Sequence, residues 1–370
     1  MDSNRYLRKL CKLAHMPPRE IVARTASLVH RRRERAIWRN APKPFWRKAA
    51  TNSFKLVDAD VFGLGRRIAD VDAFRRRCNK ASENLAASSI ANAEAISSRR
   101  WRMLGFDFDL TGNTDWHSDP RSEFRWPKKF YADLPLYELP SGVDVKYVWE
   151  LGRQQYVVEL AKAWLVGGDE KYTKRACREI ESWRYDNPLD EGIHGTSGLE
   201  VAMRSISWIW TLGLLSSWAG WPAEAAARIG DSLVDHAQYL RNHFSFYSSP
   251  YNNLVGEATA MYLLGLALKD GHPHAGRWQC YGRDVLLEHG PKQFYADGFC
   301  VEQATGYHYY TVGFLTMAIV AARKSDDPLT KLESTVHQAY RAGIAFRQPN
   351  GRWPAIGDVD SARSIPVHSD

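Results

Sequence analysis

The sequence is poor in cysteine and has no long hydrophobic run. Its five cysteines lie far apart and form no Cys-x-x-Cys pair, which argues against a disulfide framework or a structural zinc site. No apolar stretch approaches the ~20 residues of a membrane-spanning helix, so an integral membrane segment is not expected. The basic N-terminus lacks the apolar segment of a secretory signal peptide. We therefore expect a cytoplasmic protein, with the periplasm or cell envelope as the alternative if secretion uses another route.

The formal charge of +8 is concentrated at the N-terminus. Residues 1–80 contain 21 Lys and Arg against 7 Asp and Glu, whereas residues 81–370 contain 29 against 35. Such a basic arm is typical either of a protein with an anionic partner or of a solvated helix face. No zinc-finger, RNA-recognition or basic-zipper signature accompanies the arm, so nucleic acid is not an expected partner.

Tryptophan is abundant, and ten of the 14 tryptophans lie between Trp101 and Trp221. Clustered tryptophan indicates either a packed helical core or platforms on which flat ligands such as sugar rings stack. Changes in composition divide the chain into a basic helical arm over residues 1–100 and a main domain over residues 101–350. The main domain begins with a turn-rich connector, residues 101–143. Residues 351–370 are the third segment, a linker or the start of a further domain.

From Asp144 onward the sequence predicts long helices in pairs. The first helices of the pairs are expected to start near Asp144, Ser197, Asn253 and Gly306. The second helices are expected to start near Asp169, Pro222, Arg277 and Asp327. A period of about 50 residues with two helices per unit indicates stacked helical hairpins. Because the units resemble one another only weakly, we predict a mainly α protein that forms an incomplete (α/α) toroid of paired antiparallel helices.

Unusual polar residues recur at the start of the first helix in each pair. They are Lys146, Trp149, Glu150, Arg153 and Gln154; His194, Thr196, Ser197, Glu200 and Arg204; Tyr251, Asn252, Asn253 and Glu257; and Glu302, Gln303, Tyr307 and His308. Alternate helices of a ring point the same way, so these starts are expected on one face. Helix N-termini present free N–H groups and partial positive charge, which suits an anionic ligand.

Each of these residues also has a purely structural interpretation. Asn252 or Asn253 could be an ordinary N-cap. The spacings of Glu150 with Arg153 and of Glu200 with Arg204 suit ion pairs within a helix. The aromatic run that contains Tyr307 and His308 could belong to the core, and His117, between Asp115 and Asp119, could simply decorate a turn. Their shared position in four successive units favours a functional interpretation.

Several stretches, in this order and spacing, resemble the heparinase II/III-like polysaccharide lyases, a group that includes alginate and oligoalginate lyases. They are Trp116–Pro120, Asp144–Gln154, Asn187-Pro188, Gly192–Trp208, Asn252–Ala258, Asp297-Gly298, Glu302–His308, Gly357-Asp358 and Asp360. The resemblance covers the N-terminal helical domain of that family. It implies an incomplete α/α toroid followed by a β-sandwich, which is expected to be absent or truncated here because residues 351–370 would only begin it.

The resemblance also implies roles for individual residues. Asn252 matches the asparagine that neutralises the uronate carboxylate, and Asn253 stands where the family commonly has histidine. Tyr307 matches the catalytic tyrosine, and His308 matches the histidine beside it. The expected substrate-binding residues are Lys146, Trp149, Glu150, Arg153, His194, Glu200 and Arg204, with His117 more loosely placed.

The chemistry implied is β-elimination from a 4-linked uronic acid in a heparin-like, heparan-like or alginate-like polymer. The proton on C5 is weakly acidic, so hydrogen-bond donors must neutralise the adjacent carboxylate. An asparagine amide beside a helix N-terminus does this without a metal, and neither a metal nor another cofactor is expected. Tyr307 is the expected acid, and also the base in a syn elimination, with His308 or Arg204 aiding its ionisation. The expected partner is an anionic polysaccharide or oligosaccharide.

Two other functions remain open from the sequence. An inverting glycoside hydrolase on the same scaffold would need two carboxylates roughly 6.5–9.5 Å apart. The candidates for such a pair are Glu150, Glu200, Glu257, Asp297 and Glu302. A non-catalytic carbohydrate-binding or surface-polysaccharide assembly protein is the third interpretation. The sequence leaves the oligomeric state, the choice of polymer, and endo or exo action open.

Overall fold

The computed structural model describes most of the chain. The described residues are 16–40, 60–63, 71–81, 83–98, 100–109, 114–325, 327, 329–358 and 363–365. Asp360 lies outside these residues, as do residues 359–362 and 366–370 of the segment predicted over residues 351–370. The same is true of large parts of the arm that we predicted over residues 1–100.

The described chain is helical apart from one small sheet. In this sheet β1 (Arg100–Met103) pairs antiparallel with β2 (Phe106–Asp109), so that Trp101 lies opposite Phe108. The helices before it are α2 (Pro18–Asn40), α4 (Val71–Ala81) and α5 (Glu83–Ser97). The helices after it are α6 (Val145–Gly152), α7 (Gln155–Gly167), α8 (Glu170–Asp186), α9 (Gly198–Leu214), α10 (Ala223–His243), α11 (Asn252–Ala267), α12 (Ala275–His289), α13 (Thr305–Lys324) and α14 (Thr330–Ala345). Three short 3-10 turns complete the set: η3 (Tyr131–Asp133), η4 (Ile193–Gly195) and η5 (Pro291–Gln293).

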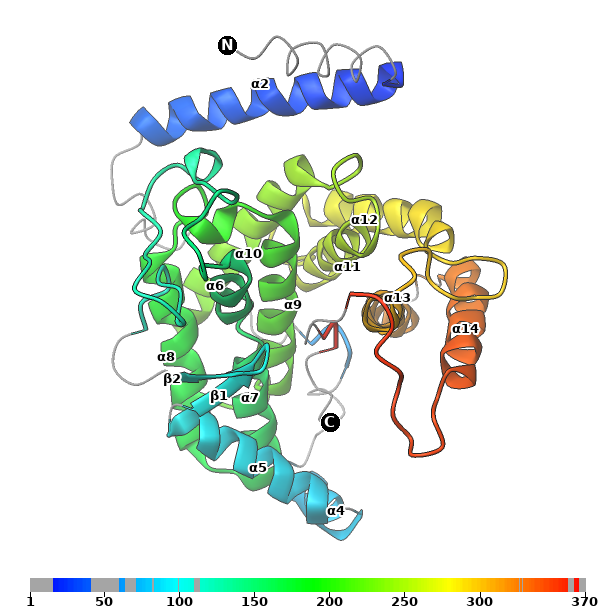
Figure 1. The fold of residues 1–370 in the computed structure, drawn as a ribbon. Helices are drawn as coiled ribbons and strands as arrows, with labels where there is room; N and C mark the ends of the chain where they lie inside the picture. Colours follow the sequence, from blue (N-terminus) through cyan, green and yellow to red (C-terminus); the bar gives the residue numbers. More distant parts are fainter. Residues whose placement is uncertain are drawn as a thin grey trace.

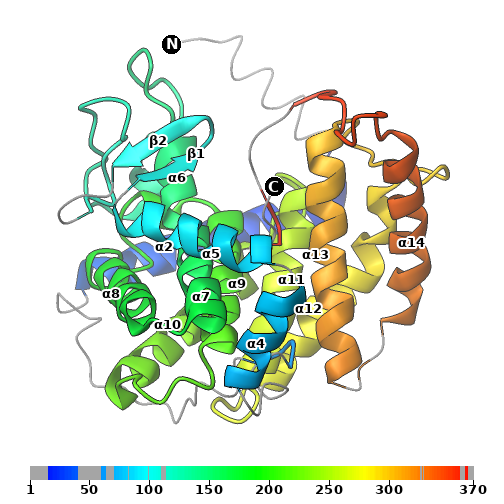
Figure 2. The ribbon, with the colours of Figure 1, turned by 90° about the horizontal axis from the view of Figure 1, so that it is seen from below.

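The helices form two layers, as an α/α toroid requires. Helices α7, α9, α11 and α13 pack side by side in sequence order as an inner layer, and α8, α10, α12 and α14 each pack against an inner neighbour. Figures 1 and 2 place α7 and α8 at one side of the molecule and α13 and α14 at the other. The helices therefore form an incomplete α/α toroid, which confirms the predicted fold class.

The burial pattern of each helix reflects its layer. All residues of α9 from Leu199 to Leu214 are buried, because this helix has neighbours on every side. In α8 the buried residues recur at helical spacing, including Tyr172, Ala176, Ile180 and Trp183, and they form one stripe that faces α7. Charged residues on the other side of α8 face solvent.

Local sequence signals place most helix boundaries correctly. The side chain of Asp144 caps α6 by accepting a hydrogen bond from the N–H of Lys146 at 2.9 Å, and Asp169 caps α8 in the same way. Gly168 ends α7 with a φ of +84°, a conformation that favours glycine. The eight expected helix starts lie within three residues of the observed ones.

We predicted one continuous helix from Asp144 as the first helix of its pair. This prediction was wrong, because the helix is interrupted between α6 and α7. Gln154 has a φ of +52° and interrupts the helix. Its buried side chain donates to the carbonyl oxygen of Glu179 at 3.2 Å and accepts from Nε1 of Trp208 at 2.6 Å. These two bonds to distant helices hold a backbone conformation that the local sequence does not favour.

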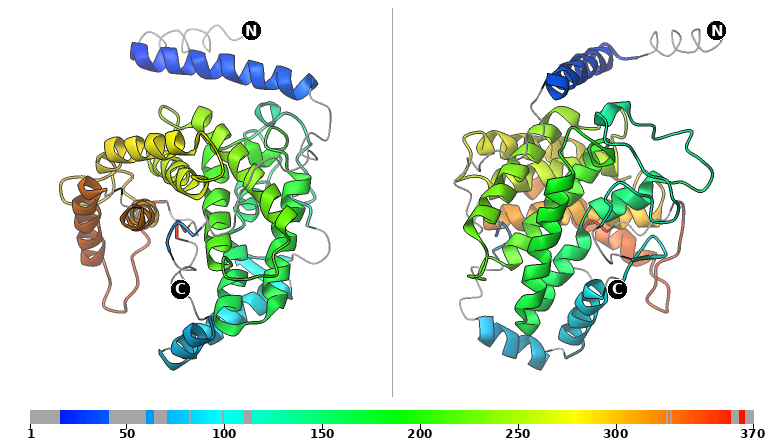
Figure 3. Two further views of the ribbon diagram at one scale, coloured as in Figure 1. Left: turned by 180° about the vertical axis from the view of Figure 1, so that it is seen from behind. Right: turned by 90° about the vertical axis from the view of Figure 1, so that its left-hand side faces the viewer.

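The N-terminal helices differ in how they join the body. Helix α5 packs on α7, and its Ala93 and Ile96 are fully buried in the main core. Helix α2 has no buried residue and lies across one end of the body, as Figure 3 shows from behind. The predicted division of the chain at residue 100 stays a prediction.

Most of the described tryptophans pack in the core. The largest fully buried side chains include Trp116, Trp126 and Trp208, whereas Trp149 is half-buried and Trp353 is 38% exposed. The abundance of tryptophan in this chain thus reflects mainly core packing, and few of these rings are accessible for stacking on a ligand. No helix in the described ranges is long and apolar enough to cross a membrane.

Candidate functional site

A buried ion-pair cluster joins the end of α6 to the start of α9. Arg153 donates from Nε and Nη2 to the two carboxylate oxygens of Glu200, at 2.7 and 2.9 Å. Its Nη1 donates to Glu150 at 2.6 Å. The predicted pair of Glu150 with Arg153 is confirmed. The alternative pairing of Glu200 with Arg204 is wrong, because Arg153 takes both oxygens of Glu200.

The charges in this cluster stabilise one another. Burial lowers the pKa of Arg153, but the carboxylates of Glu150 and Glu200 outweigh it, so the pKa is raised well above its ordinary value. All three charged residues are buried. The cluster therefore holds α6 and α9 together at the end where the inner helices start.

Arg204 lies deeper than the sequence indicates. It is fully buried, its guanidinium lies 3.8 Å from the ring centre of Trp183, and its Nη1 donates to the carbonyl oxygen of Gly152 at 3.2 Å. Burial lowers the pKa of Arg204 to about 9, although the negative charge of Glu200 acts to raise it. The structure thus places Arg204 beneath the break between α6 and α7 and away from solvent.

His117 and His194 lie next to each other in the same buried region. Their ring centres are 5.9 Å apart, and both side chains are at most 2% exposed. Nε2 of His194 bonds the carbonyl oxygen of Trp116 at 2.6 Å, and burial lowers the pKa of His194 well below its ordinary value. Burial also lowers the pKa of His117 to about 4. Both rings are expected to be neutral near pH 7, and they pack the connector against α6.

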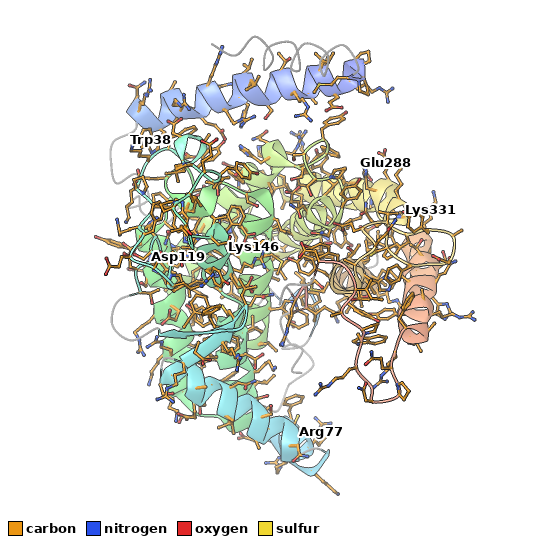
Figure 4. All side chains as sticks on the ribbon, viewed as in Figure 1. Trp38, Arg77, Asp119, Lys146, Glu288 and Lys331 are labelled. Carbon is orange, nitrogen blue, oxygen red and sulfur yellow. The ribbon has the colours of Figure 1, made fainter. Side chains whose placement is uncertain are left out.

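Trp149 and Lys146 are the more accessible of the predicted residues on α6. Nε1 of Trp149 donates at 3.2 Å both to the carbonyl oxygen of Ile193 and to Oγ1 of Thr196, which fixes the half-buried indole beside η4. Lys146 is exposed on the first turn of α6, and Figure 4 labels it in front of the inner helices.

A second group of polar residues lies where α11 begins. Nδ2 of Asn252 donates to both carboxylate oxygens of Glu302, at 2.9 and 2.8 Å, and the N–H of Asn252 donates to the same carboxylate at 3.2 Å. Asn252 is the first residue of α11, and Tyr251 occupies the cap position, so Asn252 is not an N-cap. Burial raises the pKa of Glu302, while the donors of Asn252 oppose this shift. Asn253 is half-buried beside this pair.

Tyr307 and His308 point in different directions from α13. The hydroxyl of Tyr307 donates to Asp358 at 2.7 Å. His308 is fully buried, stacks on Phe299, and its Nε2 bonds the carbonyl oxygen of Ala339 on α14 at 3.0 Å. Successive helix residues differ by about 100° in direction. The structure therefore brings Tyr307 and Asp358 together and places His308 between α13 and α14, away from the Tyr307 hydroxyl.

The face of the inner helices at their N-terminal ends thus carries two carboxylate-binding arrangements, one at Arg153 and one at Asn252. Comparison with known proteins assigns the chain to a family. Residues 54–368 match the family described as heparinase II/III N-terminus, which is most of the chain. The chain belongs to this heparinase II/III family.

Two curated lyases are similar to this heparinase II/III chain. A heparin-sulfate lyase of Bacteroides thetaiotaomicron is 22% identical over 307 residues, which cover 76% of this chain and 40% of that protein. A heparin-sulfate lyase of Bacteroides stercoris is 22% identical over 220 residues, which cover 50% of this chain and 31% of that protein. The chain therefore spans at most about 40% of the length of these relatives.

Solved structures share the fold of this heparinase II/III chain. The crystal structure of heparinase III superposes with a TM-score of 0.55 at 20% identity and covers 71% of this chain and 39% of that one. The heparan sulfate lyase HepC from Pedobacter heparinus superposes with a TM-score of 0.52 at 20% identity and covers 76% and 44%. At this level of identity the likeness shows a common fold.

Glu257 is a buried carboxyl of the heparinase II/III domain, which the sequence placed among the polar residues at the helix starts and among the hydrolase candidates. It is fully buried on α11 and accepts hydrogen bonds from the N–H and the hydroxyl of Ser245, both at 2.7 Å. Burial raises the pKa of Glu257 to about 8, although the two donors favour the ionised form. Near neutral pH this carboxyl is therefore largely protonated.

The raised pKa predicts that stability falls as pH rises. The folded protein binds the proton of Glu257 more tightly than the unfolded chain does, so this contribution is complete below about pH 4.5 and is lost as pH rises towards 8. Glu257→Gln keeps the shape without a charge and should remove a few kcal/mol of this pH dependence. Urea unfolding at pH 6, 7 and 8 measures it. Equal pH slopes in the wild type and the variant would contradict the prediction.

The sequence did not predict the roles of two residues of the candidate site. Glu302 accepts hydrogen bonds from Asn252, and Asp358 accepts one from Tyr307. Glu302 was listed among the polar residues at the helix starts, and Asp358 lies in a matched stretch, so both carried a signal.

A surface pocket of about 410 Å³ lies at the other end of the inner helices. It is bounded by α4, the end of α7 and the turn after α9, and its lining includes Arg75, Trp164 and Trp218. Arg75 already donates to the carbonyl oxygens of Trp164 and Leu165. None of the predicted site residues lines this pocket, so it is separate from the candidate site.

Proposed function

We propose that this chain is the helical part of a polysaccharide lyase that cleaves a uronic-acid-containing glycan by β-elimination. Family membership supports this function, as do the two similar proteins that are heparin-sulfate lyases. The proposed substrate class is an anionic, heparan-like or alginate-like polysaccharide or oligosaccharide.

The observation that carries the proposal is the hydrogen bonding of a carboxylate by Asn252. The side-chain amide and the N–H of Asn252, at the start of α11, together hold the carboxylate of Glu302. A uronate carboxylate needs the same donors, since negative charge accumulates on it when the C5 proton leaves. In the proposed complex Asn252 donates to the uronate carboxylate. Glu302 either keeps a hydrogen bond to the Asn252 amide and orients it, or is displaced by the uronate.

Tyr307 is the proposed proton-transfer residue. Its side chain is half-buried, and its hydroxyl donates a hydrogen bond to Asp358 at 2.7 Å. In the proposed syn elimination Asp358 takes the proton of this hydroxyl, and the tyrosinate oxygen then takes the C5 proton. The hydroxyl formed in this way gives that proton to the leaving O4. Glu302 precedes Tyr307 by five residues, which brings the proposed carboxylate-binding and proton-transfer groups to the same end of α13.

The remaining predicted residues divide by accessibility. Trp149 and Lys146 are proposed to contact sugar rings and acidic groups of the substrate. Glu150, Arg153 and Glu200 hold the adjoining helices together. Arg204, His117 and His194 are fully or almost fully buried. We therefore propose that they do not contact the substrate and that they pack against the site residues and hold them in position.

The hydrolase alternative is disfavoured by what the carboxylates bind. Glu150 and Glu200 are both paired with Arg153, and Glu302 is held by Asn252. Glu257 is buried against Ser245, and Asp297 is an exposed turn residue that accepts from the N–H of Phe299 at 2.9 Å. An inverting hydrolase needs one carboxylate that is free to activate water and one that carries a proton towards the leaving group. The elimination proposed above needs neither.

Product analysis of the native gene product tests the proposal. We expect heparan-like or alginate-like polymers to yield unsaturated uronates that absorb in the ultraviolet. Asn252→Asp should reduce the rate at least about 100-fold, because it removes the amide donor and places a second charge beside Glu302.

Asn242→Asp is the matched control, because it makes the same change at an exposed position at the end of α10. It should leave the rate unchanged. Saturated reducing ends would indicate a hydrolase. Oligosaccharide binding without turnover would indicate a binding protein, and equal rates for the two aspartate variants would refute the role of Asn252.

A further inference from the structure

A cluster of metal-ligating side chains lies outside the candidate site, where α2 meets the body. His30 and Glu34 are one turn apart on α2, and His243 is the last residue of α10. One ligand atom from each of the three lies within 4.8 Å of the others. We propose that His30, Glu34 and His243 bind a divalent transition-metal ion, of which Zn²⁺ fits best, and that this ion fixes α2 on the helical body.

Each histidine lies close to a different oxygen of the Glu34 carboxylate, at distances similar to those between the ligands of a zinc ion. Nε2 of His30 lies 3.1 Å from Oε1 of Glu34, and Nε2 of His243 lies 3.4 Å from Oε2 of Glu34. Zn²⁺ binds histidine nitrogen and carboxylate oxygen at about 2.0–2.2 Å, so its ligands lie roughly 3.3–3.5 Å from one another. Two histidines and one carboxylate are also a common zinc ligand set, with the fourth position left to water.

The hydrogen bond at Nδ1 of His243 orients its Nε2 towards Glu34. Nδ1 of His243 lies 2.7 Å from the carbonyl oxygen of Tyr239, and because a carbonyl only accepts, Nδ1 is the donor. In the neutral ring Nε2 then carries the lone pair on the side of Glu34. Metal-binding histidines commonly donate from the second ring nitrogen to a backbone carbonyl in this way.

A fourth side chain lies at the cluster. The hydroxyl of Tyr131 lies 2.7 Å from Glu34 and 2.9 Å from Nε2 of His243, but its single proton can serve only one of them. A bound cation would interact with Glu34 and with Nε2 of His243 at the same time, which the proton of Tyr131 cannot do.

The rest of the contact between α2 and the body is mainly polar, apart from Trp38, whose ring packs against Phe130 with the ring centres 5.9 Å apart. Arg35 pairs with Asp133, Nε1 of Trp38 donates to Glu191 at 3.2 Å, and Arg24 donates to the carbonyl oxygen of Tyr247 at 3.1 Å. Figure 4 labels Trp38 at the end of α2 that meets the connector. Because α2 has no buried residue, hydrophobic burial contributes little to holding it. An ion bound by residues of both parts would supply this missing stabilisation.

Titration with Zn²⁺ tests the proposal on the native gene product after treatment with a chelator. We expect one high-affinity equivalent per chain by calorimetry. His243→Ala and Glu34→Gln should each weaken this affinity at least tenfold. His337→Ala removes an exposed histidine on α14 and is the matched control, which should bind as the wild type does. Far-ultraviolet circular dichroism verifies that each variant is folded.

Limited trypsin digestion tests whether the ion fixes α2, whose exposed arginines are cleavage sites. Zn²⁺ should slow cleavage within α2 at least fivefold in the wild type and in His337→Ala, and should have no effect in Glu34→Gln. Absence of a stoichiometric Zn²⁺ ion, equal affinity in wild type and His243→Ala, or unchanged cleavage would each overturn the proposal. None of these measurements depends on lyase activity, so they can fail independently of the proposed function.

Discussion

Tyr307→Phe should lower the rate of elimination by a factor of about 100 to 10,000, the range that a positioned acid or base contributes. The substitution removes the hydroxyl that donates to Asp358 and leaves the half-buried ring in place. The fold should therefore persist while proton transfer to O4 is lost. The initial rise in ultraviolet absorbance of unsaturated uronate measures the rate, and substrate binding should be little changed.

Tyr309→Phe is the matched control for this experiment. Its hydroxyl donates to the carbonyl oxygen of Gly343 at 3.1 Å, between α13 and α14, and so has no part in the proposed chemistry. We expect a rate within about twofold of the wild type. Full elimination activity in Tyr307→Phe would refute the proposed mechanism, and an equal loss in both variants would indicate a structural effect.

Arg153→Met should destabilise the protein by about 3–5 kcal/mol, the usual cost when one partner of a buried ion pair is removed. Glu150 and Glu200 are then left as two buried carboxylates without a cation, at the junction of α6 and α9. The urea midpoint of unfolding should fall accordingly. Because Arg153 also shapes the site, the rate of elimination should fall as well.

Two further variants show whether burial causes this loss. Arg125→Met breaks the pair of Arg125 with Asp115, whose side chains are about half exposed, and should cost at most about 1 kcal/mol. Adding Glu150→Gln and Glu200→Gln to Arg153→Met removes the uncompensated charges and should restore part of the stability. A loss no larger in Arg153→Met than in Arg125→Met would contradict the prediction.

The helices and their order could be predicted because their signals are local. Asp144 and Asp169 cap helices through their own side chains, Gly168 ends one, and apolar residues recur at helical spacing along each. A toroid follows when such helices come in pairs of constant period. The shared position of Asn252, Glu302 and Tyr307 at helix starts also carried enough information to place them at one end of the inner layer.

The sequence by itself therefore determined the helical pairs, the fold class and the end of the toroid at which the polar residues gather. Only the tertiary structure decided which partner each of them has. Glu200 pairs with Arg153 rather than Arg204, His308 faces α14, and Gln154 breaks a helix. These outcomes depend on contacts between residues far apart in the chain. Such contacts compete with the local pairings that the sequence spacing suggests. In a buried, weakly polar interior the better-formed long-range bond prevails.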